Sequence, residues 1–165
     1  MNPTKLFKKQ KTLRDKIIKQ HNLQGKALLK NYILALQVEI GELANEWRGF
    51  KHWSLNKKMN RYAALEEFAD CLSFILEIGL EIDVIPSYIK DIQKSTITDQ
   101  FNELYYICAN LLYCYEKGYG VANQYYYLFE HFIGLGRLLG FTRKEIEQAY
   151  IRKNVINQKR QGEGY

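Results

Sequence analysis

Apolar residues recur every three to four positions along almost the whole chain. This is the period of a helix that turns one face toward a core, whereas a half-buried strand alternates at every second residue. Proline, which interrupts helices, occurs only at Pro3 and Pro86. A chain of 165 residues is long enough to bury a core of its own. The sequence therefore predicts a single all-α domain over residues 1–165, a helical bundle with a four-helix core.

Turn residues divide this pattern into six expected helices. Thr142 and Glu145 have the spacing of a capping box, in which each side chain accepts a hydrogen bond from the backbone of the other. We expect a loose link over residues 84–97, with a short helix after Pro86, and fraying from Gly162 to the chain end. The expected helices span Thr4–Lys19, Lys26–Arg48, Arg61–Ile82, Thr98–Lys117, Val121–Leu139 and Thr142–Arg160.

Two acidic pairs stand in separate predicted helices of an otherwise basic chain. Glu39 and Glu42 form one pair, and Glu67 and Asp70 form the other. A spacing of three places both carboxylates of a pair on one helix face. If the two helices pack together, four like charges meet in a small volume and require cations to stay ionised. Mg²⁺ is the natural partner, because it binds carboxylates and substrate phosphates while keeping part of its water.

A single acidic pair on an amphipathic helix is more often a solvated face than a site. Here the neighbours are apolar, and Asp70 leads directly into the run from Cys71 to Leu76, which is typical of a buried helix interior. An acid at the start of such a segment is costly unless it is paired or bound to metal. The two pairs together therefore predict a magnesium site for cleaving a phosphate ester or anhydride.

Charge and cysteine content limit the other classes. The net charge is +6, but the basic residues gather at both ends without a zinc-finger or RNP-type motif, so we expect no stable nucleic-acid binding. The three histidines are scattered, which disfavours zinc. The three cysteines form no close pair and suit a reducing compartment. With no signal peptide or membrane-spanning run, we expect a cytoplasmic protein without a membrane partner.

Three polar residues of the last predicted helix share one stripe. Lys153, Asn157 and Arg160 follow one another at four and then three residues. Such a stripe can bind phosphates through charge and paired hydrogen bonds, although alone it could equally be a solvated basic face. Tyrosines are abundant between Tyr105 and Tyr127, on more than one helix face, which suggests a subunit interface and a homodimer.

The spacing of the acids resembles the E-x-x-E…E-x-x-D pattern of the all-α nucleoside triphosphate pyrophosphatases, which include MazG-like proteins and dimeric dUTPases. The tail, Lys153-Asn154-x-x-Asn157-x-x-Arg160-Gln161-x-x-Gly164-Tyr165, is similar to the closing motif of the dimeric dUTPases. The segments Glu46-Trp47…Lys51-His52-Trp53 and Leu6-x-x-x-Gln10-x-x-Leu13 resemble that subfamily too. Arg14 departs from it, since a short polar or acidic residue is expected there.

The resemblance implies hydrolysis of dUTP to dUMP and pyrophosphate, which limits uracil incorporation into DNA. By its place in the motif, Glu42 is implied as the general base that activates water, within a metal shell completed by Glu39, Glu67 and Asp70. The resemblance also implies that Gln10 pairs with the uracil edge. Lys51 and Trp53 are candidate nucleotide contacts; Trp53 could stack on a base, although it could almost equally be a core or interface tryptophan.

Two alternatives stay open. One is a MazG-like or dCTP-directed pyrophosphatase, because base choice depends on a few hydrogen bonds that a sequence does not display. The other is a catalytically idle relative that binds nucleotide as a regulatory module. The presence of all four acids argues against the idle form.

Overall fold

The computed structural model describes residues 1–163, and its regular structure in that range is entirely helical. This confirms the all-α fold class. The helices are α1 (Pro3–Gln20), α2 (Leu29–Trp47), α3 (Arg61–Glu81), α4 (Ile97–Lys117), α5 (Val121–Leu138) and α6 (Arg143–Gly162).

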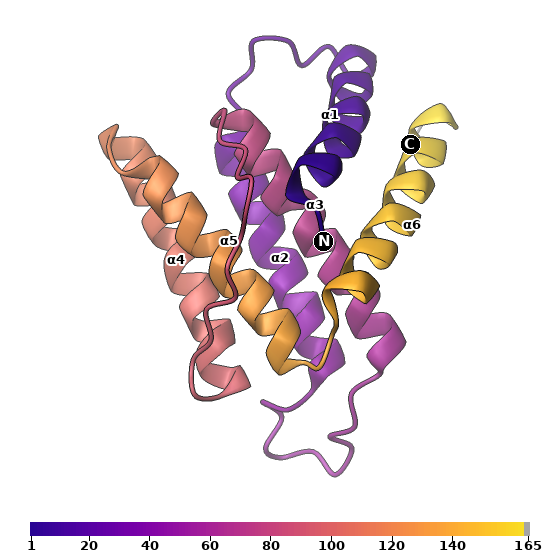
Figure 1. Cartoon of the computed structure of the whole chain (residues 1–165), viewed down its shortest axis with the longest axis vertical. Helices are drawn as coiled ribbons and strands as arrows, with labels where there is room; N and C mark the ends of the chain where they lie inside the picture. Colours follow the sequence, from indigo (N-terminus) through magenta and orange to yellow (C-terminus); the bar gives the residue numbers. More distant parts are fainter. Residues whose placement is uncertain (164–165) are drawn as a thin grey trace.

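Helices α2, α3, α5 and α4 pack in a closed ring of neighbours, which forms a four-helix core. Helices α1 and α6 pack against α3 and against each other. In Figure 1, α4 and α5 lie to the left and α1 and α6 to the right, with α2 and α3 between them. Helix α3 is therefore the most enclosed, and buried residues cover most of its faces between Phe68 and Gly79.

Several helix starts are capped by side chains, and the cap predicted from the sequence is among them. Thr142 Oγ1 accepts a hydrogen bond from the Glu145 amide, and the Glu145 carboxylate accepts one from the Thr142 amide. The predicted capping box is thus confirmed. Asn60 and Thr96 cap α3 and α4 in the same way, each accepting from the amide three residues later. These caps satisfy amides that otherwise have no partner in the first helical turn.

The short helix expected after Pro86 is absent from the structure, so that prediction was wrong. Residues 84–94 instead run without helical or strand structure. The Ile92 amide donates to the Glu130 carbonyl of α5 at 3.1 Å, and the Gln100 side chain donates to the Ile92 carbonyl at 3.0 Å. A Cβ on Gly134 would lie only 1.8 Å from that carbonyl oxygen, so only glycine allows this approach. Because α5 and Gln100 satisfy this backbone, the segment does not need a helix.

Helix α2 starts later than the expected Lys26. The Leu28 amide donates to Glu81 Oε1 of α3 at 2.8 Å, so a distant carboxylate caps α2 at Leu29. Helix α6 continues to Gly162, two residues beyond the expected end. The motif residues Gly164 and Tyr165 lie outside the described residues. No helix within residues 1–163 is long and apolar enough to cross a membrane.

Candidate active site

A pocket of about 430 Å³ opens where α1, α2, α3 and α6 meet. Its volume falls within the range of about 300–1,000 Å³ that is usual for small-ligand sites. It combines acidic, basic and apolar side chains from all four helices. The lining residues are Gln10, Leu13, Arg14 and Ile17 of α1, Tyr32, Glu39 and Glu42 of α2, Glu67, Asp70, Ser73, Phe74 and Glu77 of α3, and Lys153, Asn157, Arg160 and Gln161 of α6.

The packing of α2 on α3 brings the two acidic pairs to this one pocket. Carboxylate oxygens of Glu39, Glu67 and Asp70 lie within 4.8 Å of one another. Glu42 lines the same pocket but is exposed to solvent and stands outside this group of three. The arrangement therefore offers three close oxygen ligands, with a fourth carboxylate on the solvent side.

The close carboxylates disfavour one another's charge. Burial and the charges of Asp70, Glu42 and Glu67 raise the pKa of Glu39 to about 7. Burial and the neighbouring acids likewise raise the pKa of Glu67. A divalent cation placed among these oxygens reverses this effect, because an opposite charge favours the ionised form of a carboxyl group.

Lys153 of α6 faces the same acids. Its Nζ lies 2.5 Å from Asp70 Oδ2, and both side chains are largely buried. Burial raises the pKa of Asp70, while the hydrogen bond and charge of Lys153 oppose that rise. One ammonium group thus partly neutralises the cluster, at the position where α6 crosses α3.

Asn157 and Arg160 line the pocket one and two turns beyond Lys153, so the predicted stripe does face the acids. The orientation of α6 follows from the earlier part of the same helix face, where Ile146, Ala149 and Tyr150 enter the core one to two turns before Lys153. Asn154 is buried as well, and its Oδ1 accepts a hydrogen bond from Gln158. Cations and anions therefore face each other across the pocket.

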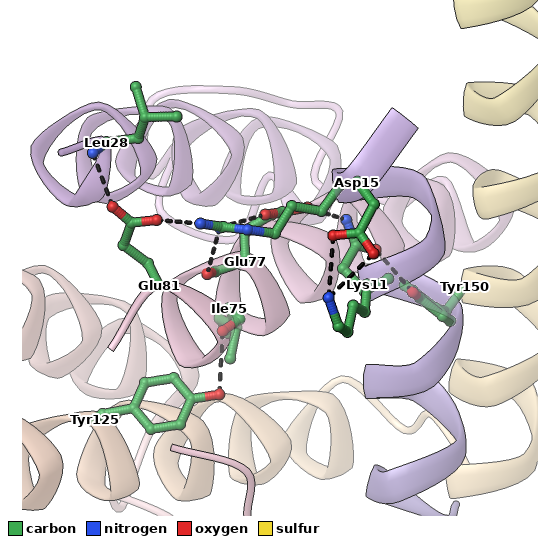
Figure 2. Close-up of polar contacts among 10 residues, drawn as sticks. Lys11, Asp15, Leu28, Ile75, Glu77, Glu81, Tyr125 and Tyr150 are labelled. Atoms are coloured by element: carbon green, nitrogen blue, oxygen red, sulfur yellow. Dashed lines mark hydrogen bonds and ion pairs between the residues drawn. The ribbon is translucent and has the colours of Figure 1, made fainter. Parts of the chain in front are cut away.

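A second group of charged side chains closes the pocket farther along α3. Gln10 Nε2 donates to Glu77 Oε1 at 2.6 Å, and Arg14 donates to Glu77 Oε2 at 2.9 Å. Figure 2 labels Glu77, Glu81 and Tyr150 of this group. Arg14 also binds Glu81, the carboxylate that caps α2. The Tyr150 hydroxyl donates to Gln10 Oε1 at 2.7 Å. Burial raises the pKa of Glu77, and its contacts with Gln10 and Arg14 oppose that rise.

Between the acid cluster and this network, the pocket wall is largely apolar. Leu13 and Ile17 of α1 face it together with Phe74 of α3 and Tyr32 of α2. The guanidinium carbon of Arg14 lies 5.5 Å from the centre of the Tyr32 ring, within the range of a cation–π contact. The pocket is thus built for a ligand with an anionic end and a flat or apolar end.

Two predicted substrate residues, Lys51 and Trp53, do not line this pocket. Both lie in the 48–60 loop that connects α2 with α3 (Figure 1). Trp53 is 67% exposed, and its ring packs edge-on against Phe50 and His52. Their contact with a nucleotide stays a prediction that the single chain does not test.

Several lining residues were not identified from the sequence. Phe74 and Glu77 lie four and seven residues after Asp70, on the helix face that carries the acids, so their spacing could have indicated them. Arg14 stood out only as a departure from a motif. Tyr32 lies seven residues before Glu39 on the same face of α2, so its spacing could have indicated it as well.

Comparison with protein-family models gives a match over nearly the whole chain. A family described as dUTPase matches residues 2–165. A search of curated proteins found none that matches the chain.

Proposed function

The chain belongs to the dUTPase family, and from this membership we propose that it hydrolyses dUTP to dUMP and pyrophosphate in a Mg²⁺-dependent reaction at the α1–α2–α3–α6 pocket. One observation carries the assignment to this pocket. The close carboxylates of Glu39, Glu67 and Asp70 share it with the cations of Lys153 and Arg160. Such a site suits a triphosphate that brings its own charge and a bound cation. This hydrolysis would remove dUTP from the pool of nucleotides available for DNA synthesis.

The donor set fits Mg²⁺. All three close ligand groups are carboxylates, the hard oxygen donors that this ion prefers. The raised pKa of Glu39 and of Glu67 indicates negative charge that Lys153 alone does not balance. We propose that Glu39, Glu67 and Asp70 hold the ion, with Glu42 beside them. The bound ion would supply Lewis acidity and charge neutralisation for the phosphates.

The chain's own side chains have separate roles in this proposal. Lys153, Asn157 and Arg160 bind phosphate oxygens, because α6 presents all three to the pocket. Glu42 accepts the proton of the attacking water, since it is solvent-exposed while lining the same pocket. Closure around the substrate then excludes bulk water and strengthens these charge interactions.

The apolar wall takes the nucleoside. With the phosphates held between the acid cluster and α6, the base reaches Phe74 and Tyr32, and Gln10 faces its hydrogen-bonding edge. We keep Trp53 and Lys51 as proposed nucleotide contacts from the 48–60 loop. The buried, unpaired cysteines agree with the reducing cytoplasm that we propose as the location.

We also propose that the protein is a homodimer. Leu34 and Val38 of α2 are 63% and 53% exposed, and Tyr106 and Tyr113 of α4 are exposed as well. A Lys30–Glu116 ion pair and the packing of α2 on α4 place these side chains on one side of the bundle. An apolar and aromatic face of this kind is typical of a subunit interface.

A panel of nucleoside triphosphates tests the function. The purified chain is incubated with dUTP, dCTP, dTTP and UTP in the presence of Mg²⁺, and pyrophosphate and orthophosphate are measured separately. We expect pyrophosphate from dUTP, and no reaction in excess chelator. Orthophosphate as the first product, or a preference for another triphosphate, would overturn the proposal.

A further inference from the structure

Gln10 lies at the inner end of the pocket, where it contacts the buried polar groups of Glu77 and Tyr150. Its side chain is almost fully buried, and it lines the pocket together with Glu77. Glu77 follows Asp70 by seven residues, which is about 10 Å along a helix. This distance separates the phosphate end of the pocket from its inner polar end, so Gln10 is placed to meet the base.

The amide of Gln10 has only one favourable orientation. A carboxylate can accept hydrogen bonds but cannot donate them, so Glu77 Oε1 requires the NH₂ group at 2.6 Å. The amide oxygen then faces Tyr150, whose hydroxyl donates to it at 2.7 Å. A flipped amide would set its oxygen against the Glu77 carboxylate. Arg14 binds the other Glu77 oxygen and so favours the charged, acceptor-only form.

Each polar atom of Gln10 keeps capacity for a ligand. The nitrogen carries two hydrogens and the oxygen two lone pairs, and the contacts with Glu77 and Tyr150 use one of each. An amide with one free donor and one free acceptor can pair with the edge of a pyrimidine. Uracil presents a donor at N3 and an acceptor at O4, whereas cytosine presents an acceptor at N3 and a donor at N4. A free amide can serve both bases by flipping, but a fixed amide cannot.

We propose that Glu77, held by Arg14, is a positioning residue that fixes the Gln10 amide and thereby makes the pocket select uracil over cytosine. The inference rests on the proposed function of this pocket as a nucleotide site. It gives Arg14, the residue that departs from the family motif, a defined role. Arg14 keeps the carboxylate charged and does not itself contact the base.

The substitution Glu77→Gln tests this directly. The new amide can donate as well as accept, so Gln10 is free to flip while the shape of the site is kept. Arg14 keeps its partner Glu81, so no charge is left buried alone. We expect the ratio of kcat/KM for dUTP to that for dCTP to fall about tenfold or more, mainly through KM.

Two matched variants distinguish positioning from a general loss of structure. Glu81→Gln removes a carboxylate from the same Arg14 cluster but does not touch Gln10. Tyr150→Phe removes the other partner of Gln10 and leaves Glu77 in place. Both should keep the wild-type ratio. If either lowers it as much as Glu77→Gln does, Glu77 is not the orienting group and the proposal is overturned.

Binding measurements separate this inference from the proposed function. Calorimetry with dUMP and dCMP reports base selection without catalysis. A wild-type chain that releases no pyrophosphate from dUTP refutes the proposed function, yet a weakened dUMP preference in Glu77→Gln still supports the inference. Unchanged preference in both assays overturns it. If Glu77→Gln does not fold, the triple variant Arg14→Gln/Glu77→Gln/Glu81→Gln removes the three buried charges together and gives the same comparison.

Discussion

Glu42 differs from the other acids of the pocket in being exposed to solvent, and we expect it to act on water. Replacing it by Gln keeps its shape but removes its charge and its capacity to accept a proton. Pyrophosphate release from dUTP should slow by about 10²-fold or more. Glu116→Gln is the matched control, because this exposed carboxylate pairs with Lys30 away from the pocket. Activity of Glu42→Gln within a few-fold of wild type would show that another group takes the proton.

Glu39 should make metal binding depend on pH. Its pKa is raised to about 7 by burial and by its acidic neighbours, and a metal ion requires the ionised carboxylate. Below pH 7 protons therefore compete with Mg²⁺, and affinity should fall by about tenfold per pH unit for one displaced proton. Calorimetric titration with Mg²⁺ at pH 6 and pH 8 measures this. A Glu39→Gln variant should bind more weakly and lose most of the pH dependence.

Glu39 should also make the stability of the metal-free protein depend on pH. This stability should fall as pH rises, whereas Mg²⁺ affinity should increase. The pKa of Glu39 is about 7 in the folded chain, against an ordinary value of 4.5, so folding favours the protonated form. The contribution of Glu39 to the free energy of unfolding is present at acid pH and is lost as pH rises from about 4.5 through 7. Thermal unfolding in chelator should show this loss, and added Mg²⁺ should reverse it. Equal pH dependence in Glu39→Gln would assign the trend to other groups.

The end of α6 belongs to the site more than to the fold. The buried residues of this helix end at Asn154, whereas Asn157, Arg160 and Gln161 face the pocket. Deleting the residues after Lys159 should therefore keep helix content and Mg²⁺ binding. Turnover of dUTP should fall at least about tenfold, because the guanidinium that we propose to bind phosphate is lost.

A neighbouring charge provides the control for this deletion. Arg152 is exposed and does not line the pocket, so Arg152→Gln removes the same type of charge without touching the site. Circular dichroism, Mg²⁺ calorimetry and pyrophosphate release are compared for both variants. Full activity of the shortened chain would show that the stripe on α6 is only a solvated helix face.

The whole molecule should associate through the apolar face of α2 and α4. Light scattering at micromolar concentration should give about twice the chain mass of 19.5 kDa. The double variant Leu34→Glu/Val38→Glu places charge on that face and should give monomers that keep their helix content. Tyr126, exposed on α5, offers a control position for Tyr126→Glu. A wild-type chain that is already monomeric would contradict the dimer.

Patterns that act within one helix were predictable from the sequence. The capping box of Thr142 and Glu145 depends on residues three apart, and the structure contains it. The helix assignments in the core hold because the apolar period repeats along each segment. The convergence of the acidic pairs on one pocket was also expected, since packing of two helices suffices to bring them together. Their separation into three close acids and an exposed Glu42 was not foreseen.

Contacts between distant segments required the tertiary structure. The start of α2 depends on Glu81, which is 53 residues away from Leu28. The extended link at Ile92 depends on the Glu130 carbonyl of α5 and on the side-chain amide of Gln100. Gln10 and Glu77 are 67 residues apart, and no sequence motif considered above contains both residues. Helix periodicity is local and shows in sequence, whereas the partner of a buried polar group depends on which helices pack side by side.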